Sequence, residues 1–214
     1  MLLWESIPKF AADKQIKTKN MSKKNSITTA DYLPYEEFQR LLDCLEKDGK
    51  YKQCAYCLLS FCLALRISDT LTIRWMDILN KPDITVTEMK TEKTRQIPIS
   101  QNISNRLYDL YMLAGCPPLS EYVLYSGYTG RAMTKQYVNK LCKAWKKKYG
   151  LKIGNFSSHT FRKTFGRYVY EKMGRTDEAL IKLNYIFHHT SLKITQIYIG
   201  LRKQETDEIF NSLG

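Results

Sequence analysis

The chain has 214 residues, of which 34 are Lys or Arg and 21 are Asp or Glu, and 43% are hydrophobic. This length and apolar content suit one globular domain with or without a short extension, and they exclude a disordered tail protein. The longest nearly uninterrupted apolar run, residues 54–65, is well short of the roughly 20 residues that a membrane-spanning helix needs. Residues 1–12 lack the pattern of a secretion signal, so the six cysteines are expected to be thiols in a reducing, cytoplasmic setting.

The positive charge is concentrated in one window of the sequence. Residues 131–175 contain 13 Lys or Arg against a single acid, Glu171, and so carry 12 of the 13 net positive charges. Such a patch neutralises phosphates and releases counterions, which predicts a nucleic-acid partner and a salt-dependent affinity. The alternative is a solvated lysine face that has no partner.

The N-terminal part of the chain predicts an arm followed by a helix. Residues 1–30 are rich in lysine and show little periodicity, which indicates a basic linker or arm. The folded domain, residues 31–214, is expected to start near Asp31. Pro34 and the acids that follow it open a first helix. Its apolar stripe is Phe38, Leu41, Leu42 and Leu45.

Two more helices and a hairpin are predicted next. Residues 52–65 favour an almost wholly apolar helix, and Ser68 can cap a short helix that ends near Trp75. Polar and apolar residues alternate on both sides of residues 90–95, so 83–100 predicts a β-hairpin with that segment at its tip. This hairpin is the only clear sheet signal in the sequence.

The second half of the chain predicts helices. Thr134 caps one whose outer face is rich in lysine and whose apolar stripe is Val138, Leu141, Cys142 and Trp145. The others are expected at 102–114, from Ser158 or Thr160 to Gly174, and at 177–187, 191–199 and 203–212. The predicted fold class is therefore α+β and mainly α, a helical domain with a small antiparallel hairpin.

Two residue pairs have a spacing that suits metal ligands. Cys54 and Cys57 lack a second pair of ligands, and their neighbours are apolar, so core packing is the preferred interpretation. His188 and His189 would point about 100° apart on a helix, and no cluster of carboxylates accompanies them. No metal site is expected.

The order of several short motifs is more specific than any one of them. The motifs are LRISDTLTIRW from Leu65, KTEKTRQIPI from Lys90, His159-Thr160-Phe161-Arg162, and FHHTSLKITQIY from Phe187. Over about residues 31–205 this arrangement resembles the tyrosine recombinase (phage integrase) family. That family has an arginine box, Gly-Leu-Arg-x-Ser-Glu followed by Leu-Arg-Trp, then a hairpin lysine and a His-x-x-Arg box. Its last box is Leu-Gly-His-Ser-Ser followed by Thr-x-x-Tyr.

The resemblance implies a site-specific recombinase or integrase that breaks and rejoins duplex DNA through a 3′-phosphotyrosyl intermediate. It implies six catalytic residues, which are Arg66, Lys90, His159, Arg162, His189 and Tyr198. Guanidinium groups suit the charge on the non-bridging oxygens, and the histidines can bind the phosphate or move the tyrosine proton. Lys90, or alternatively Lys93, would protonate the leaving 5′ oxygen, and Tyr198 would be the nucleophile. No metal, ATP or other cofactor is then required.

Three positions depart from the family's pattern. His188 stands where the family usually has glycine, and Phe187 where it has leucine, so a different local backbone is open at this point, as is the choice of working histidine between His188 and His189. Asp69 stands where Glu is more common. Its expected role is to hold Arg66 through a charge-assisted hydrogen bond.

Double-stranded DNA is the expected partner, with self-association into a tetramer on DNA, association with the nucleoid and no membrane partner. The expected DNA-binding residues are Lys135, Lys140, Lys143, Lys146, Lys147 and Lys163. The family usually carries a helical core-binding domain, which 30 residues cannot supply. The chain is then either part of a longer protein or a short recombinase without that module. The rival hypotheses are a type IB topoisomerase-like enzyme and a DNA-binding regulator that no longer cuts.

Overall fold

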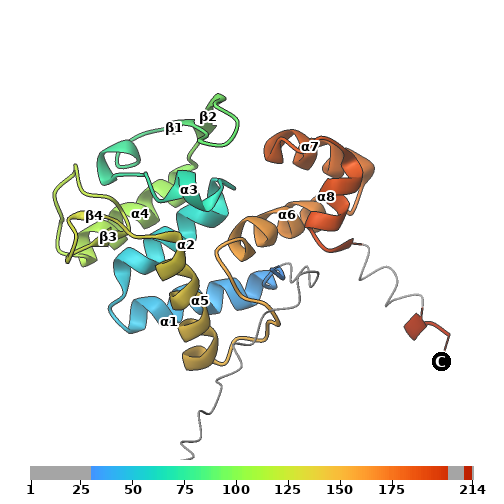
Figure 1. Ribbon diagram of the computed structural model, residues 1–214, viewed down its shortest axis with the longest axis horizontal. Coiled ribbons are helices and arrows are strands. Elements are labelled where there is room, and N and C mark those ends of the chain that lie inside the picture. Colours follow the sequence, from blue (N-terminus) through green and yellow to red (C-terminus); the bar gives the residue numbers. More distant parts are fainter. Residues whose placement is uncertain (1–29, 202–209, 214) are drawn as a thin grey trace, which may run out of the picture.

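The computed structural model describes residues 30–201 and 210–213 (Figure 1). Within these residues the protein is mainly helical, with two small antiparallel sheets of two strands each, so the predicted fold class is confirmed. No helix of the described part is both long and apolar enough to cross a membrane. All but the last residue of the expected arm, 1–30, and most of the last expected helix, 203–212, lie outside the described residues.

The first four elements are α1 (Tyr35–Lys47), α2 (Tyr51–Cys62), α3 (Ile67–Thr70) and the 3-10 turn η1 (Trp75–Asp77). Helix α1 buries the four residues of its predicted apolar stripe. Helix α2 is buried along most of its length and packs against α1, α4 and α6. It ends earlier than predicted, and Ala64 just beyond it has a left-handed backbone (φ 50°).

The short helix α3 differs from its prediction at both ends. It begins after Arg66, which occupies the N-cap position, so Ser68 lies inside the helix and donates its hydroxyl to Asp69. The helix ends at Thr70, and Trp75 begins a separate 3-10 turn. This shift places the backbone of Arg66 at a helix start.

The predicted hairpin is confirmed as β1 (Asp83–Thr87) and β2 (Thr94–Pro98). Its tip is 88–93 rather than the predicted 90–95, because Thr94 and Arg95 pair with β1. A second sheet, β3 (Tyr125–Ser126) and β4 (Arg131–Ala132), was not predicted. Strands of two residues are too short to show an alternating pattern, so the sequence carried no sign of it.

The remaining helices are α4 (Gln101–Leu113), α5 (Lys135–Tyr149), α6 (Thr160–Lys172), α7 (Asp177–Phe187) and α8 (Leu192–Tyr198). Thr134 caps α5 as predicted, accepting a hydrogen bond from the backbone of Tyr137, and Gly150 ends the helix in the left-handed conformation. The predicted apolar stripe of this helix faces the core, although Leu141 is only partly buried.

Helices α6, α7 and α8 lie together on one side of the molecule, next to the larger group of elements (Figure 1). A small apolar cluster joins them, with Phe187 and Ile199 fully buried. Gly166 of α6 allows this packing, because a Cβ there would lie 2.7 Å from a methyl carbon of Ile199 and 2.9 Å from the ring of Phe187. The close approach brings α6 to the end of α7 and to the residue after α8.

Candidate active site

Arg162 of α6 lies deep between the two groups of helices and is 4% exposed. Its guanidinium donates to the carbonyls of Ala64 and Phe187, the latter at 2.9 Å, and lies 4.7 Å from the centre of the Phe187 ring. Burial lowers the pKa of Arg162 to about 10, so the group remains a cation at neutral pH. A fixed cation at this depth is suited to stabilising a phosphate.

Tyr198 is the last residue of α8 and points toward this cation. Its ring lies 5.0 Å from the ring of His189 and 5.2 Å from that of Phe187, measured between centroids. Burial raises the pKa of the Tyr198 hydroxyl, while the charges of Arg162 and Arg66 lower it by less. The structure therefore brings Arg66, Arg162, His189 and Tyr198 together, and we call these four residues the arginine–tyrosine cluster.

His189 is held in one orientation by neighbours that the sequence did not single out. The Thr195 hydroxyl donates to the Asn184 side chain at 2.9 Å, so at its 3.0 Å contact with His189 Nδ1 it acts as the acceptor. His189 Nδ1 consequently carries the proton, and Nε2 is left with a free lone pair. Burial, together with the charges of Arg162 and Arg66, lowers the pKa of His189 to about 4. The ring is therefore neutral at neutral pH.

Arg66 is held by a different acid from the expected one. Its guanidinium pairs with Glu88, whereas Asp69 accepts hydrogen bonds from the backbone of Met89 at 3.0 Å and from Ser68. The expected role of Asp69 is therefore wrong, because its carboxylate faces the start of the hairpin tip. Asp69 holds the hairpin, and Glu88 holds Arg66.

Glu88 is a residue that sequence reasoning missed, although a sign of it was present. Ile84 and Val86 are the buried positions of β1, and the same alternation places Glu88 on their face. Its side chain is 0% exposed. Burial raises the pKa of Glu88, but hydrogen bonds from Thr91 and Arg66 and the charges around it lower the pKa by more. A charged residue on the apolar face of a strand was the available clue.

Lys90 and Lys93 both lie on the exposed hairpin tip. Within the described residues, neither side chain makes a hydrogen bond or ion pair with the arginine–tyrosine cluster. The structure thus places both candidate proton donors on the tip beyond Glu88, and it does not choose between them.

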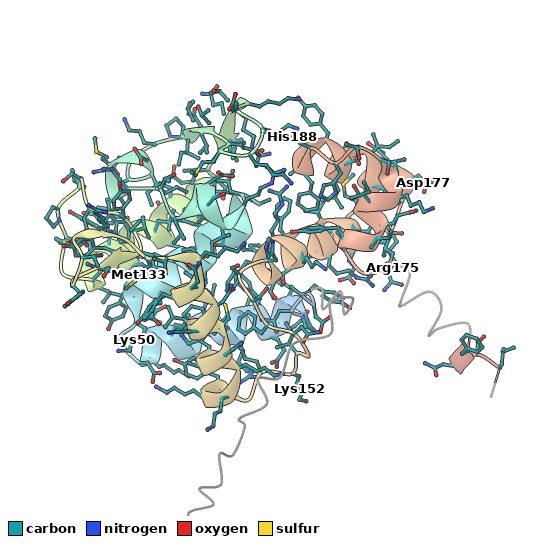
Figure 2. All side chains as sticks on the ribbon, in the orientation of Figure 1. Lys50, Met133, Lys152, Arg175, Asp177 and His188 are labelled. Carbon is teal, nitrogen blue, oxygen red and sulfur yellow. The ribbon has the colours of Figure 1, made fainter. Side chains whose placement is uncertain are left out.

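His159 and His188 occupy the ends of two helices. His159 precedes α6 and keeps part of its side chain in solvent, while burial of the rest and then the charges of Lys135, Lys163 and Arg162 lower its pKa. His188 follows α7 in the left-handed conformation (φ 51°), which glycine adopts most easily. Figure 2 shows His188 at the end of α7 that faces the hairpin.

The expected DNA-binding lysines divide into two groups. Those on α5 are exposed, apart from Lys146, which is partly buried and donates to the carbonyl of Gly154 at 2.6 Å. We call Lys135, Lys140, Lys143, Lys146 and Lys147 the lysine face. Lys163 is not part of it, because Lys163 lies on α6, is 7% exposed, and places its ammonium 5.1 Å from the centre of the Tyr198 ring.

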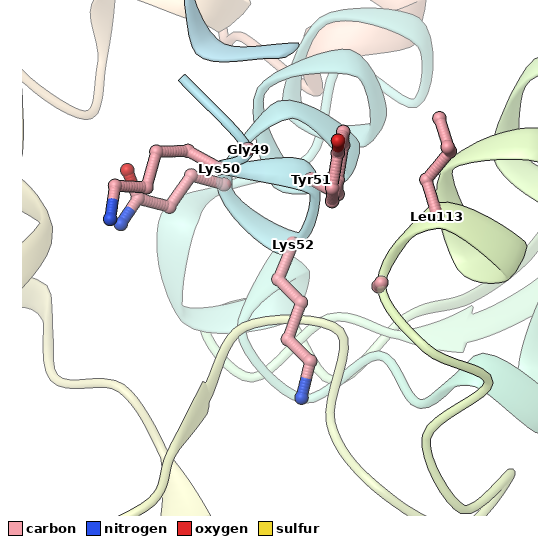
Figure 3. A pocket seen from close by; sticks show the side chains of 7 residues that line it. Gly49, Lys50, Tyr51, Lys52 and Leu113 are labelled. Atoms are coloured by element: carbon pink, nitrogen blue, oxygen red, sulfur yellow. The ribbon is translucent and has the colours of Figure 1, made fainter. Parts of the chain in front are cut away.

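The described residues include a shallow pocket away from the expected catalytic residues, a buried cysteine pair and no cluster of metal ligands. A shallow pocket at the start of α2, lined by Lys50, Tyr51, Lys52 and Leu113 among others, contains none of the expected catalytic residues (Figure 3). Cys54 and Cys57 are buried in the core. In the part of the chain that the structure describes, no group of three or more His, Cys, Asp or Glu could hold a metal ion.

Comparison with known proteins identifies relatives across most of the chain. Residues 31–205 match the phage integrase family. The probable integrase/recombinase YoeC of Bacillus subtilis (strain 168) is 30% identical over 151 residues, which cover 71% of this chain and 78% of YoeC. The tyrosine recombinase XerC of Bradyrhizobium diazoefficiens is 24% identical over 190 residues, which cover 84% of this chain and 57% of XerC.

Solved structures share the fold. XerH recombinase in a post-cleavage complex with palindromic difH substrate has a TM-score of 0.63 and 21% identity, over 91% of this chain and 57% of that chain. A lambda integrase dimer bound to a COC′ core site has a TM-score of 0.58 and 17% identity, over 79% of this chain and 59% of that chain. The chain thus spans little more than half the length of XerC, XerH and this lambda integrase. By its sequence match and its fold, it belongs to the phage integrase family and is a tyrosine recombinase catalytic domain.

Proposed function

We propose that this chain is the catalytic part of a site-specific DNA recombinase, which cuts and rejoins duplex DNA through a 3′-phosphotyrosyl link at Tyr198. Residues 31–214 form the catalytic domain, and residues 1–30 a basic arm. The observation that carries the proposal is the arginine–tyrosine cluster, in which the ring of Tyr198 packs against the neutral His189 ring and the Tyr198 hydroxyl is subject to the charges of Arg162 and Arg66. Breaking and rejoining of DNA is the activity of the family to which the chain belongs.

The chemistry is an exchange of one phosphate ester for another. The Tyr198 oxygen attacks phosphorus and forms a P–O bond, while the bond from phosphorus to the 5′ oxygen breaks and its electron pair leaves with that oxygen. Arg66 and Arg162 donate to the non-bridging oxygens, where negative charge develops. One phosphate ester replaces another, so the energy of the broken bond is kept in the new one. The reverse attack by a 5′ hydroxyl therefore rejoins the strand without an outside energy source.

Two protons move in this step. His189 presents a free Nε2 lone pair on the ring that meets Tyr198, which suits it to accept the hydroxyl proton. His159, at the start of α6, is suited to bind the same phosphate. Lys90 is the proposed donor of the proton that the leaving 5′ oxygen takes, with Lys93 as the alternative. Neither a metal ion nor a nucleotide takes part in this scheme.

Double-stranded DNA is the proposed partner, bound through the lysine face and the arginine–tyrosine cluster. XerH is described in complex with its difH substrate, and lambda integrase as a dimer on a core site. By this likeness we propose that the present chain also assembles on DNA, as a tetramer during strand exchange.

Covalent trapping tests the proposed function. The full chain is incubated in EDTA with a pool of nicked duplexes of randomised sequence, and adducts are isolated by denaturing electrophoresis. The expected result is an adduct mapped to Tyr198, without nucleotide, and a consensus in the trapped DNA. An adduct on another residue, strict dependence on Mg²⁺, or the absence of any adduct would contradict the proposal. Absence would favour a regulator that binds without cutting.

A further inference from the structure

Glu88 is a fully buried acid to which the proposed chemistry gives no role. Its carboxylate pairs with the guanidinium of Arg66, accepts a hydrogen bond from the Thr91 hydroxyl at 2.9 Å, and lies 3.6 Å from Nε of Arg95. A buried carboxylate is stable only when it is paired and hydrogen-bonded. These contacts therefore fix the position of Glu88 relative to both the hairpin and α3.

The turn that carries Lys90 closes on Glu88. The backbone N–H of Glu92 donates to the Glu88 carbonyl at 2.8 Å, and the N–H of Glu88 donates to the carbonyl of Lys93 at 3.0 Å. Thr91, the residue after Lys90, reaches the Glu88 carboxylate with its side chain. Backbone and side chain of Glu88 thus both hold the turn in which Lys90 lies.

The part of the hairpin just before its tip is fixed to the same segments as the arginine–tyrosine cluster. Arg95 of β2 donates to the carbonyl of Leu63 at 3.1 Å and to that of Ile186 at 2.7 Å. Arg162 binds the carbonyls of the residues that follow these two in the chain. These contacts hold the strand end next to the tip, and the position of the tip itself depends on the contacts made beyond Arg95.

Two carboxylates make those contacts with α3. Asp69 accepts the backbone N–H of Met89, which fixes the first residue of the turn. Glu88 joins the turn to the guanidinium of Arg66 itself. Of these two links, the one through Glu88 connects a phosphate-binding group directly to the turn of Lys90.

We propose that Glu88 is a positioning residue for DNA cleavage, which ties the turn of Lys90 to Arg66 so that the proton donor and the phosphate-binding guanidinium meet one phosphate in a fixed geometry. The inference rests on the proposed function, in which Lys90 protonates the leaving 5′ oxygen. Proton donation requires close placement of the donor. A bridging 5′ sulfur leaves without a proton, so it does not need Lys90 in place.

The test compares two leaving groups on the duplex recovered by trapping, with oxygen or sulfur at the bridging 5′ position. The variants of the full chain are Glu88→Gln, which removes the charge, and Thr91→Val, which removes one hydroxyl. Glu92→Gln is the matched control, because Glu92 is an exposed acid in the same turn. Both test variants should slow cleavage about tenfold or more with oxygen and much less with sulfur, and the control should do neither.

A second comparison uses Lys90→Ala as the background. Glu88→Gln should add little further slowing on the oxygen substrate there, because the group that it positions is gone. A purely structural role would slow both substrates in both backgrounds.

Equal slowing with oxygen and sulfur, or no slowing in either variant, would overturn the inference. If Glu88→Gln does not fold, Thr91→Val decides alone, since it leaves the ion pair with Arg66 intact. Failure of the proposed function looks different, because the unmodified chain would then form no adduct at Tyr198 with either leaving group.

Discussion

The arginines of the arginine–tyrosine cluster, Arg162 buried and Arg66 partly buried, carry the same charge as the mostly exposed lysines of the lysine face, in different surroundings. Arg162 is 4% exposed, and backbone carbonyls from two segments hold its guanidinium. The lysines of α5 project from the outer side of a helix whose other side packs into the core. One region holds its cations by hydrogen bonds and ion pairs, and the other exposes most of them to solvent.

This difference separates two functions of positive charge. A fixed cation loses little entropy when a phosphate binds and can be aimed at charge that develops during reaction. A mobile lysine adds affinity through counterion release, without a demand on geometry. Substitutions among the arginines should therefore affect cleavage, and substitutions among the exposed lysines should affect the salt dependence of affinity.

The largest effect is expected for Tyr198→Phe. Removing the hydroxyl should abolish the covalent protein–DNA adduct, because no oxygen remains to attack phosphorus. Duplex affinity should stay nearly unchanged, since cationic groups supply most of the binding. Adduct formation is measured by denaturing electrophoresis and affinity by fluorescence anisotropy. A surviving adduct, mapped for example to Tyr185, would show that the nucleophile has been misassigned.

Arg162→Ala should remove cleavage and also destabilise the fold. It leaves the carbonyls of Ala64 and Phe187 without their charged donor, which costs roughly 3 kcal/mol of unfolding free energy. Urea denaturation measures this loss. The matched control is Arg167→Ala, because Arg167 is also buried on α6 but pairs with Glu171, away from the cluster. The control should destabilise the protein yet leave the folded fraction able to cleave. If both variants lost cleavage, the effect of Arg162→Ala could not be assigned to the arginine–tyrosine cluster.

The sequence predicted the elements whose signals are local. Helix α7 has the predicted bounds, because Thr176 caps it with its side chain and two acids occupy its first turn. The start of the short helix α3 was predicted wrongly, because its N-cap residue, Arg66, makes no side-chain hydrogen bond to the helix. The paired strands β3 and β4 were not predicted, because their two residues each are held by contacts that no local pattern shows.

In the candidate site, too, the sequence did not show contacts that depend on long-range packing. Motif order pointed to Arg66, Arg162, His189 and Tyr198, which the fold brings together. It could not show that Glu88, rather than Asp69, pairs with Arg66, because that choice depends on where the hairpin packs on α3. Charge counting also could not tell that Lys163 is buried, since its exposure depends on the packing of α6.

The lysine face should determine the salt dependence of binding. Replacing Lys140, Lys143 and Lys147 by Gln should lower the slope of log affinity against log salt by up to about 0.9 for each phosphate that is no longer neutralised. Stability should change by less than about 0.5 kcal/mol for each replacement, because these side chains are exposed. Lys163→Met is the control from the buried region, and it should leave the slope unchanged. A lower slope in Lys163→Met would place that lysine on DNA after all.

The smallest expected effect is a dependence of stability on pH that comes from His189. Its pKa in the folded protein is about 4, below the ordinary 6.5, because burial and two arginines disfavour its charged form. Between these values the unfolded chain binds more protons than the folded one, so stability falls as the pH drops from about 6.5 toward 4 and is unaffected above that window. Relative to His189→Gln, the unmodified protein should lose about 1 kcal/mol between pH 7 and pH 5, allowing for a partly exposed ring. Urea denaturation at each pH measures the difference. Parallel pH profiles for the unmodified protein and His189→Gln would show that His189 is not held in its neutral form, and the role of its Nε2 as proton acceptor would then fail.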